Sequence, residues 1–185
     1  RAVLLQYTGV LGIGVMALAL VLAARPVAFE PWLGGLDKMY RLHKWLGITA
    51  LALSLAHWLL AVLPGHLVGL GWLRRQAYSA SPLRTELPAL EWLQQALRGQ
   101  RGMAVVVGEW AFYLAVLMML LALVRYFPYR YFFKVHRLLA AAFLALAWHA
   151  VVLMRVDYWM GALGPPLAVL VVAGSIAAVR VLLRR

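Results

Sequence analysis

Four histidines stand inside long apolar stretches of this sequence, and they fall into two pairs. His43 and His57 are fourteen residues apart, and His136 and His149 are thirteen apart. A histidine inside a membrane-spanning helix is costly to leave without a partner, so it usually marks a functional site. Imidazole ligates iron, copper and zinc. Four such residues in two pairs therefore predict ligation of a metal or of a metal cofactor.

The spacing within each pair predicts two sites at different depths. A rise of ~1.5 Å per residue separates His43 from His57 by about 21 Å and leaves them within about 40° of one helix face. That separation is too long for one metal ion and suits two haems, one near each bilayer surface. Thirteen residues turn His136 roughly 140° from His149 on an ideal helix. The second pair therefore requires a tilted or locally rewound helix, or haems approached from different directions.

The available ligand types narrow the chemistry further. The sequence has no cysteine, which excludes thiolate metal sites, disulfides and the covalent attachment of c-type haem. The stretches that carry the histidines also lack the acidic residues that would complete a site for a bare metal ion. Two histidines on opposite sides of a haem iron occupy both axial positions, which suits electron transfer better than oxygen binding. The prediction is two b-type haems with bis-histidine ligation.

Helices that cross a bilayer must hold these histidines, and each crossing takes roughly 20 apolar residues. The chain is 65% apolar over 185 residues, with a mean hydropathy of +0.85, which is more than a soluble domain of this size can bury. No strand pattern is present. The predicted fold is therefore all-α, an integral membrane helical bundle that forms a single domain, 1–185. The predicted spans are 2–24, 42–63, 103–124, 132–154 and 162–183.

The order of these spans predicts which histidines share a haem. The second and fourth spans cross the membrane in the same direction, so His43 lies level with His136, and His57 lies level with His149. We call His43 and His136 the inner pair, and His57 and His149 the outer pair. The two haems are expected between the second and fourth spans.

The net charge of +12 comes mainly from short connections and from the end of the chain. In a soluble protein this charge would favour nucleic acid, but its place between apolar runs indicates membrane topology and a lipid bilayer as partner. Short basic loops face the cytoplasm, which predicts a multi-pass protein of the plasma membrane with these segments inside the cell. The residues are Arg25, Lys38, Arg41, Lys44, Arg125, Arg130, Lys134, Arg137, Arg180, Arg184 and Arg185.

Some of these cations are candidates for contact with the inner haem. Arg41 and Lys44 bracket the first histidine of the inner pair, and Lys134 and Arg137 bracket the second. Cations at this depth pair with haem propionates. The alternative is ordinary positive-inside charge.

Three aromatic residues are candidates for contact with the porphyrins. Trp58 follows the first histidine of the outer pair, and Trp148 precedes the second. They pack on the outer haem or belong to the aromatic belt of the membrane interface. Phe143 lies between the two proposed iron levels, where it either separates the haems or packs against neighbouring helices.

The long connection 64–102 lies on the opposite side of the membrane and contains a predicted amphipathic helix, 86–98. This helix is expected to lie on the membrane or cap the bundle, with a lid over the acceptor site as the alternative. His66 follows Pro64 and is expected in a surface loop. Prolines are expected in or beside the connections, because they break helices. They are Pro26, Pro31, Pro64, Pro128, Pro165 and Pro166.

The residues around the histidines resemble the ferric reductase-like transmembrane domain shared by NADPH oxidases, ferric-chelate reductases and their bacterial relatives. The likeness rests on Arg41-Leu42-His43-Lys44 with His57, and on Phe133-Lys134-Val135-His136-Arg137 with His149. It implies an oxidoreductase that passes electrons from reduced flavin, by way of two haems, to molecular oxygen, giving superoxide, or to a ferric chelate. It also implies six helices and a cytoplasmic flavin domain. We therefore expect a further helix before Arg1, and a domain for FAD and NAD(P)H after 185 or a separate flavin dehydrogenase as partner.

Two other functions fit the sequence. The first is a cytochrome b subunit that exchanges electrons with quinone or serves a separate oxidoreductase, such as a periplasmic methionine sulfoxide reductase. The second is a haem-free transporter or scaffold, for which Glu109 is the main intramembrane acid.

The sequence contains no Gly-rich loop of the kind that binds a dinucleotide after a strand. Gly9, Gly12 and Gly14 lie in an apolar span and are expected to pack helices together.

Overall fold

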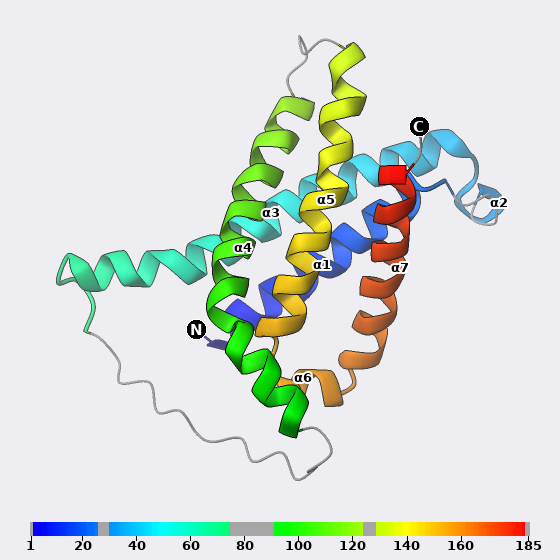
Figure 1. Ribbon diagram of the computed structural model, residues 1–185. Helices are drawn as coiled ribbons and strands as arrows, with labels where there is room; N and C mark the ends of the chain where they lie inside the picture. The colour runs from blue at the N-terminus through cyan, green and yellow to red at the C-terminus, as the bar shows by residue number, and fades with distance from the viewer. Residues whose placement is uncertain (1, 26–29, 75–90, 124–128, 184–185) are drawn as a thin grey trace.

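The computed structural model describes residues 2–25, 30–74, 91–123 and 129–183, and nearly all of them are helical (Figure 1). The helices are α1 (Ala2–Ala23), α2 (Glu30–Leu33), α3 (Leu36–Gly69), α4 (Glu91–Leu123), α5 (Tyr129–Leu153), α6 (Val156–Met160) and α7 (Gly164–Leu183). No strand occurs in these ranges. Five of the helices, α1, α3, α4, α5 and α7, are long and apolar enough to cross a membrane. The predicted all-α fold with five candidate spans is confirmed.

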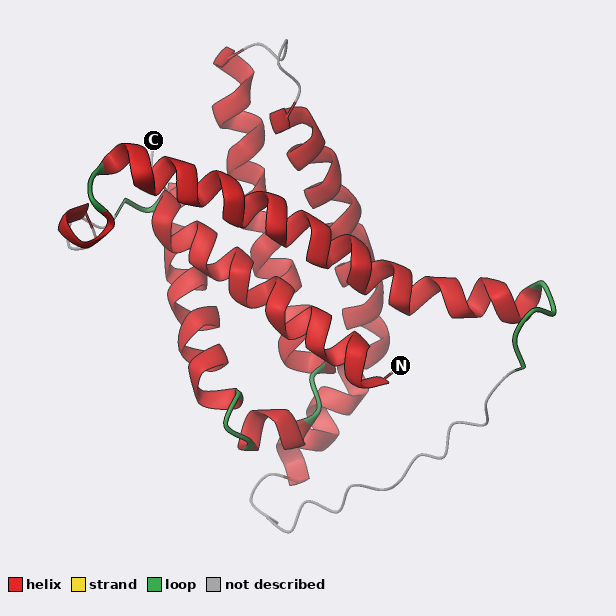
Figure 2. Ribbon diagram, turned by 180° about the vertical axis from the view of Figure 1, so that it is seen from behind, coloured by secondary structure: helices red, strands yellow, loops and turns green. Residues whose placement is uncertain are grey.

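The long helices form two side-by-side pairs joined by α7. α1 packs along α3, α4 packs along α5, and α7 contacts both α1 and α5 (Figure 1, Figure 2). The two helices that carry the histidines are α3 and α5, and no Cα atom of one comes within 8 Å of a Cα atom of the other over their described lengths. These two helices therefore meet only through long side chains.

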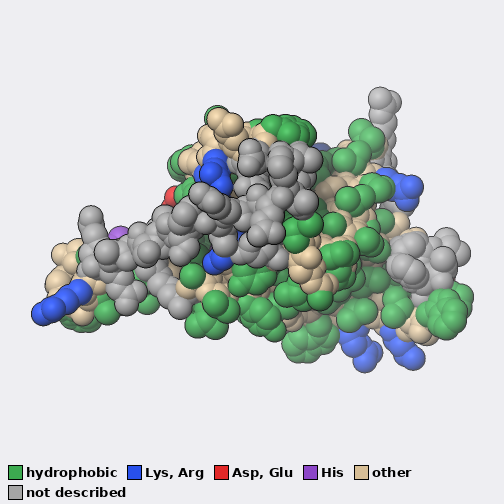
Figure 3. Space-filling model, turned by 90° about the horizontal axis from the view of Figure 1, so that it is seen from below, with side chains coloured by type: hydrophobic (Ala, Val, Ile, Leu, Met, Phe, Trp, Pro, Cys, Tyr) green, Lys and Arg blue, Asp and Glu red, His purple; other side chains and the backbone are tan. Residues whose placement is uncertain are grey.

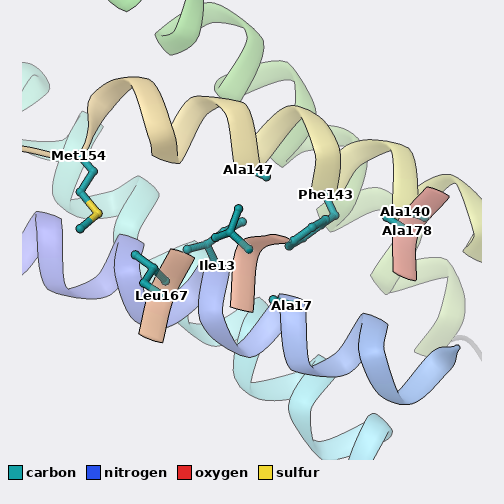
Figure 4. Packing of buried hydrophobic residues seen from close by; sticks show 9 residues of the cluster. Ile13, Ala17, Ala140, Phe143, Ala147, Met154, Leu167 and Ala178 are labelled. Carbon is teal, nitrogen blue, oxygen red and sulfur yellow. The ribbon is translucent and has the colours of Figure 1, made fainter. Parts of the chain in front are cut away.

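The packed core lies where α1, α5 and α7 meet (Figure 4). Gly174 of α7 allows the close approach, because an added Cβ there would lie 2.8 Å from the Cβ of Ala17 and 2.9 Å from the Cζ of Phe143. Small residues at such crossings promote helix packing in membranes. The buried members of this core are Ile13, Ala17, Ala140, Phe143, Ala147, Met154, Leu167, Val171 and Ala178.

Large apolar side chains cover much of the outside of the bundle. Trp110 is 70% exposed and Val169 is 68% exposed, while the described residues include no buried polar or charged side chain. Figure 3 shows a face that is mainly apolar, with Lys and Arg toward its edges. A protein in water rarely exposes apolar patches of this extent. The chain is a multi-pass membrane protein.

The end of α3 differs from the prediction. The predicted span ends at 63, but α3 continues through Pro64 to Gly69. His66 consequently lies exposed in the last turn of the helix and not in a loop. Away from water, backbone groups have few partners outside the helix, so a helix continues past a proline that removes a single hydrogen bond.

The start of α4 also differs from the prediction. α4 runs unbroken from Glu91 to Leu123, so the predicted amphipathic helix 86–98 is not a separate element. Its described part forms the first turns of α4, and residues 86–90 lie outside the described ranges. Gly99 and Gly102 do not interrupt the helix, because an interior glycine costs a helix only about 1 kcal/mol. The short α2 and α6 were not predicted, since four or five residues carry no periodic signal.

Candidate functional site

The structure brings the four histidines together as two pairs of rings. The rings of His43 and His136 have centroids 5.9 Å apart and planes at 72°. The rings of His57 and His149 have centroids 6.4 Å apart and planes at 84°. These are the same inner and outer pairs that the order of the spans predicts. Each pair joins α3 to α5 across the space that their backbones leave open.

The spacing of the rings suits one metal between the members of each pair. An imidazole nitrogen lies about 2 Å from the metal that it ligates, so two rings on opposite sides of one metal have centroids about 6 Å apart. The described residues contain no group of three or more His, Asp or Glu side chains that could hold a bare ion. Each pair therefore offers two ligands only, which fits a porphyrin that supplies the other four.

The thirteen-residue spacing on α5 is accommodated by the way the helices cross. On an ideal helix, His136 and His149 would face directions roughly 140° apart. Figure 1 shows α3 crossing α5 obliquely, so α3 lies in a different direction from α5 at each level. Both α5 histidines therefore reach an α3 histidine without a break in either helix.

Backbone carbonyls of neighbouring helices orient three of the four rings. The Nδ1 atom of His43 lies 2.9 Å from the Ala19 carbonyl oxygen, and that of His57 lies 3.0 Å from the Leu5 carbonyl oxygen, both on α1. On the other side, the Nδ1 atom of His149 lies 2.8 Å from the carbonyl oxygen of Ala104 on α4. A carbonyl only accepts, so each Nδ1 carries the proton and donates it. The Nε2 lone pair is then available to a metal, as in most histidine metal sites.

A cavity of about 300 Å³ adjoins the outer pair between α1, α3, α4 and α5. Most of the side chains around it are apolar, and His57, His149 and Trp58 are among them. Gly9 and Gly108 also line it, and each lies directly against a histidine ring. Its apolar lining offers water few polar partners and suits an apolar macrocycle whose metal the two imidazoles would ligate.

A model of the family described as ferric reductase like transmembrane component matches residues 8–147, about three quarters of the chain. The chain belongs to this family. No curated protein matches it. The matched range runs from α1 into α5 and includes the histidines of α3 and His136, and it ends two residues before His149. The resemblance drawn from the sequence is confirmed, and membership of this family implies a role in transmembrane electron transfer.

Trp58 and Trp148, the two tryptophans beside the outer pair in the sequence of this ferric reductase-like domain, have different surroundings. Trp58 lines the cavity and stacks on Phe112, with ring centroids 5.7 Å apart and planes at 15°. Trp148 does not line the cavity, and its Nε1 donates to the Oε1 of Gln100 at 3.2 Å. Of the two, only Trp58 is placed to contact a group held by the outer pair.

Phe143 packs in the core of the ferric reductase-like domain. It is 2% exposed, belongs to the cluster between α1, α5 and α7, and does not line the cavity at the outer pair (Figure 4). Of the two roles open to it, this position favours helix packing.

The cations that flank the inner pair lie at one end of the domain. Arg41, Lys44 and Lys134 are exposed there. Arg137 donates from its guanidinium to the carbonyl of Leu182, in the last turn of α7. That bond joins the start of α5 to the end of α7 and satisfies one of the carbonyls that every helix end leaves open.

Sequence reasoning missed two residues of the outer site. It predicted Gly9 as a helix-packing residue together with Gly12 and Gly14, and it did not single out Gly108. Gly9 and Gly108 face histidine rings, whereas Gly12 and Gly14 face leucine side chains. A glycine in an apolar span carries no mark of what lies opposite it, so no signal in one sequence separates these two.

Proposed function

We propose that this domain transfers electrons across a membrane between two b-type haems held by the inner and outer histidine pairs. The donor is reduced flavin on the cytoplasmic side, supplied by an FAD- and NAD(P)H-binding domain in the same chain or by a separate flavin dehydrogenase. The acceptor, on the opposite side, is molecular oxygen or a ferric chelate. The domain therefore acts as the membrane part of an oxidoreductase of the NAD(P)H oxidase or ferric reductase type.

The observation that carries this proposal is the repeated ring geometry. Two pairs of imidazoles, 5.9 Å and 6.4 Å between centroids, join the same two helices at two levels. Histidines that served only packing would have no reason to meet in this arrangement twice. Membership of the ferric reductase like family supports the same conclusion independently of that geometry.

When bound, a haem supplies an iron that carries one electron at a time. The chain's own residues do the rest. The two imidazoles of each pair would hold the iron. The carbonyls of Ala19, Leu5 and Ala104 fix the rings so that Nε2 points away from the supporting helix. The apolar walls of the cavity exclude water around the outer pair.

The sidedness follows from the distribution of basic residues. Arg25 lies over the ring of Tyr40, 5.2 Å from its centroid, which joins the end of α1 to the start of α3. Arg137 joins the start of α5 to the end of α7. The basic segments thus gather at the end of the inner pair, and the positive-inside rule assigns that end to the cytoplasm. Electrons would enter there and leave at the outer pair.

The test is a haem count on the purified chain. The protein would be prepared in detergent from haem-replete cells, and its oxidised and dithionite-reduced spectra recorded with a haem-to-protein ratio. We expect about two non-covalent b-type haems per chain, low-spin in both states. One haem would mean that a pair is misassigned. A folded preparation without haem would discard electron transfer and favour a transporter or scaffold.

The donor is tested on the same preparation. Reduced flavin should reduce both haems, whereas a quinol should not. Rapid reduction by quinol with none by flavin would replace the proposal with a quinone-linked cytochrome b subunit.

A further inference from the structure

Two glycines occupy equivalent positions beside the outer pair. The Nδ1 of His57 donates to the carbonyl of Leu5, and Gly9 follows four residues later on α1. The Nδ1 of His149 donates to the carbonyl of Ala104, and Gly108 follows four residues later on α4. The same relation thus occurs on two different helices, once for each histidine of the pair.

Helix geometry explains why a side chain at that position can obstruct the ring. Side chains tilt toward the start of a helix, so each one lies beside the carbonyl four residues earlier. Two serines of this chain show that a side chain contacts the carbonyl four residues earlier: Ser54 donates to the Ala50 carbonyl, and Ser175 donates to the Val171 carbonyl, each at 2.7 Å. A side chain four residues after the acceptor therefore lies beside that carbonyl, where it can obstruct an incoming histidine ring.

The space available at each glycine supports this explanation. A Cβ on Gly108 would lie 1.9 Å from the Nδ1 of His149, and a Cβ on Gly9 would lie 3.0 Å from the Cε1 of His57. Other glycines on the same helices are not so confined. A Cβ on Gly14 would lie 3.8 Å from the end of a leucine side chain, and a Cβ on Gly102 would meet nothing within 4 Å.

We propose that Gly9 and Gly108 are positioning residues of the outer pair, a role that rests on the proposed function. By lacking a Cβ they leave room beside the carbonyls of Leu5 and Ala104 and let the Nδ1 edge of each imidazole approach its supporting helix closely. That contact keeps the proton on Nδ1, directed at the carbonyl oxygen, and leaves Nε2 free to face the opposite ring. At the inner pair, His43 reaches the Ala19 carbonyl although Ala23 stands four residues later, so a glycine is needed only where the ring comes as close to the helix as it does at Gly9 and Gly108.

The experiment compares four single variants of the chain in detergent. Gly108→Ala and Gly9→Ala add a methyl against a histidine ring. Gly14→Ala and Gly102→Ala add the same methyl on the same two helices where there is room. The readouts are the haem-to-protein ratio and the low-spin EPR signals, with His57→Ala as the reference for the signal of the inner haem alone.

We expect Gly108→Ala to lower the ratio from about two haems to about one and to leave only the inner signal. Gly9→Ala should keep both haems and shift the EPR signal of the outer haem alone, because its clash is smaller. Both control variants should match the unmodified chain. A structural defect without a positioning role would not change the signal of one haem selectively.

The inference and the proposed function fail in different ways. Two haems in the unmodified chain, with the outer signal unchanged in both Gly108→Ala and Gly9→Ala, would overturn the positioning role alone. The same is true if Gly14→Ala or Gly102→Ala loses the outer haem equally. If Gly108→Ala does not fold, Gly9→Ala decides, and an unchanged outer signal in it overturns the role. An unmodified chain without haem would remove both proposals.

Discussion

The inner and outer histidine pairs have nearly the same geometry but very different surroundings. Both join α3 to α5, with ring centroids 5.9 Å and 6.4 Å apart, and both α3 histidines donate to carbonyls of α1. The outer pair adjoins an apolar cavity and lies against Gly9 and Gly108. The inner pair lies at the end of the domain where exposed cations gather.

The proposed haem ligands and the residues that would tune them therefore come from different parts of the chain. The two long helices repeat one ligand arrangement at two levels. What differs is the surroundings: close backbone packing at the outer pair, and exposed positive charge at the inner pair. The outer site should therefore respond to added methyl groups, and the inner site to removed charge and to salt.

The largest expected effect is the selective loss of one haem. His136→Ala should remove the inner haem and His149→Ala the outer haem, because each iron loses an axial ligand and its anchor on α5. The haem-to-protein ratio should fall from about two to about one in each case. Transfer of electrons to the external acceptor should then fall to background in both.

His66→Ala is the matched control for these variants. His66 is a histidine on α3 as well, but it is exposed in the last turn, and its removal should leave both haems in place. A ligand variant that kept two haems with unchanged spectra would contradict the assignment of that pair.

The next effect concerns stability and not cofactor content. Phe143→Ala should destabilise the domain by about 3–5 kcal/mol, because it empties a buried site between α1, α5 and α7. Thermal unfolding in detergent measures this, with Val169→Ala as a lipid-facing control whose effect should stay within about 0.5 kcal/mol. Both haems should remain bound at low temperature. Slower transfer between the haems in a conservative Phe143→Leu variant would instead favour a place for Phe143 on the electron path.

The sequence was sufficient to predict which histidines meet, but not what supports each ring. Spans and histidine levels follow from apolar length and residue spacing, which are local properties. The carbonyls of Ala19, Leu5 and Ala104 carry no side-chain signal, since every residue has a carbonyl. Their role appears only when α1 lies on α3 and α4 lies on α5.

Helix ends were the least predictable part of the fold. The predicted end of the second span relies on Pro64 as a helix breaker, and the predicted amphipathic helix ends just before Gly99. Both lie inside continuous helices here. A proline removes one backbone hydrogen bond and an interior glycine costs about 1 kcal/mol, so neither residue alone ends a helix whose neighbouring turns are intact.

A smaller expected effect is a change in the reduction potential of the inner haem when a nearby positive charge is removed. Neutralising an exposed cation beside it, as in Lys134→Gln or Arg41→Gln, should lower the reduction potential of the inner haem by roughly 10–40 mV, the range that corresponds to an exposed ion pair. The sign is negative because a nearby positive charge favours the more negative, reduced form. A redox titration monitors each haem separately, and the outer potential should stay unchanged.

A measurement at high salt tests whether the shift in potential is electrostatic. Raising the ionic strength toward 1 M shortens the screening length to about 3 Å, so the difference between Lys134→Gln and the unmodified chain should largely disappear. A shift that persisted in high salt, or that appeared equally at the outer haem, would mean that the change acts through packing.

The smallest expected effect separates the two tryptophans of the outer level. Trp58 lines the cavity and stacks on Phe112, whereas Trp148 is turned toward Gln100. A stacked aromatic pair is worth on the order of 1 kcal/mol, and only the part that differs between oxidised and reduced forms changes the potential, so Trp58→Leu should shift the outer haem by less than about 20 mV. Trp148→Leu should shift neither haem, because its ring does not face the cavity. Equal shifts in the two variants would mean that the potential of the outer haem depends on the aromatic belt as a whole. Residues outside the cavity would then influence the outer pair as much as those that line it.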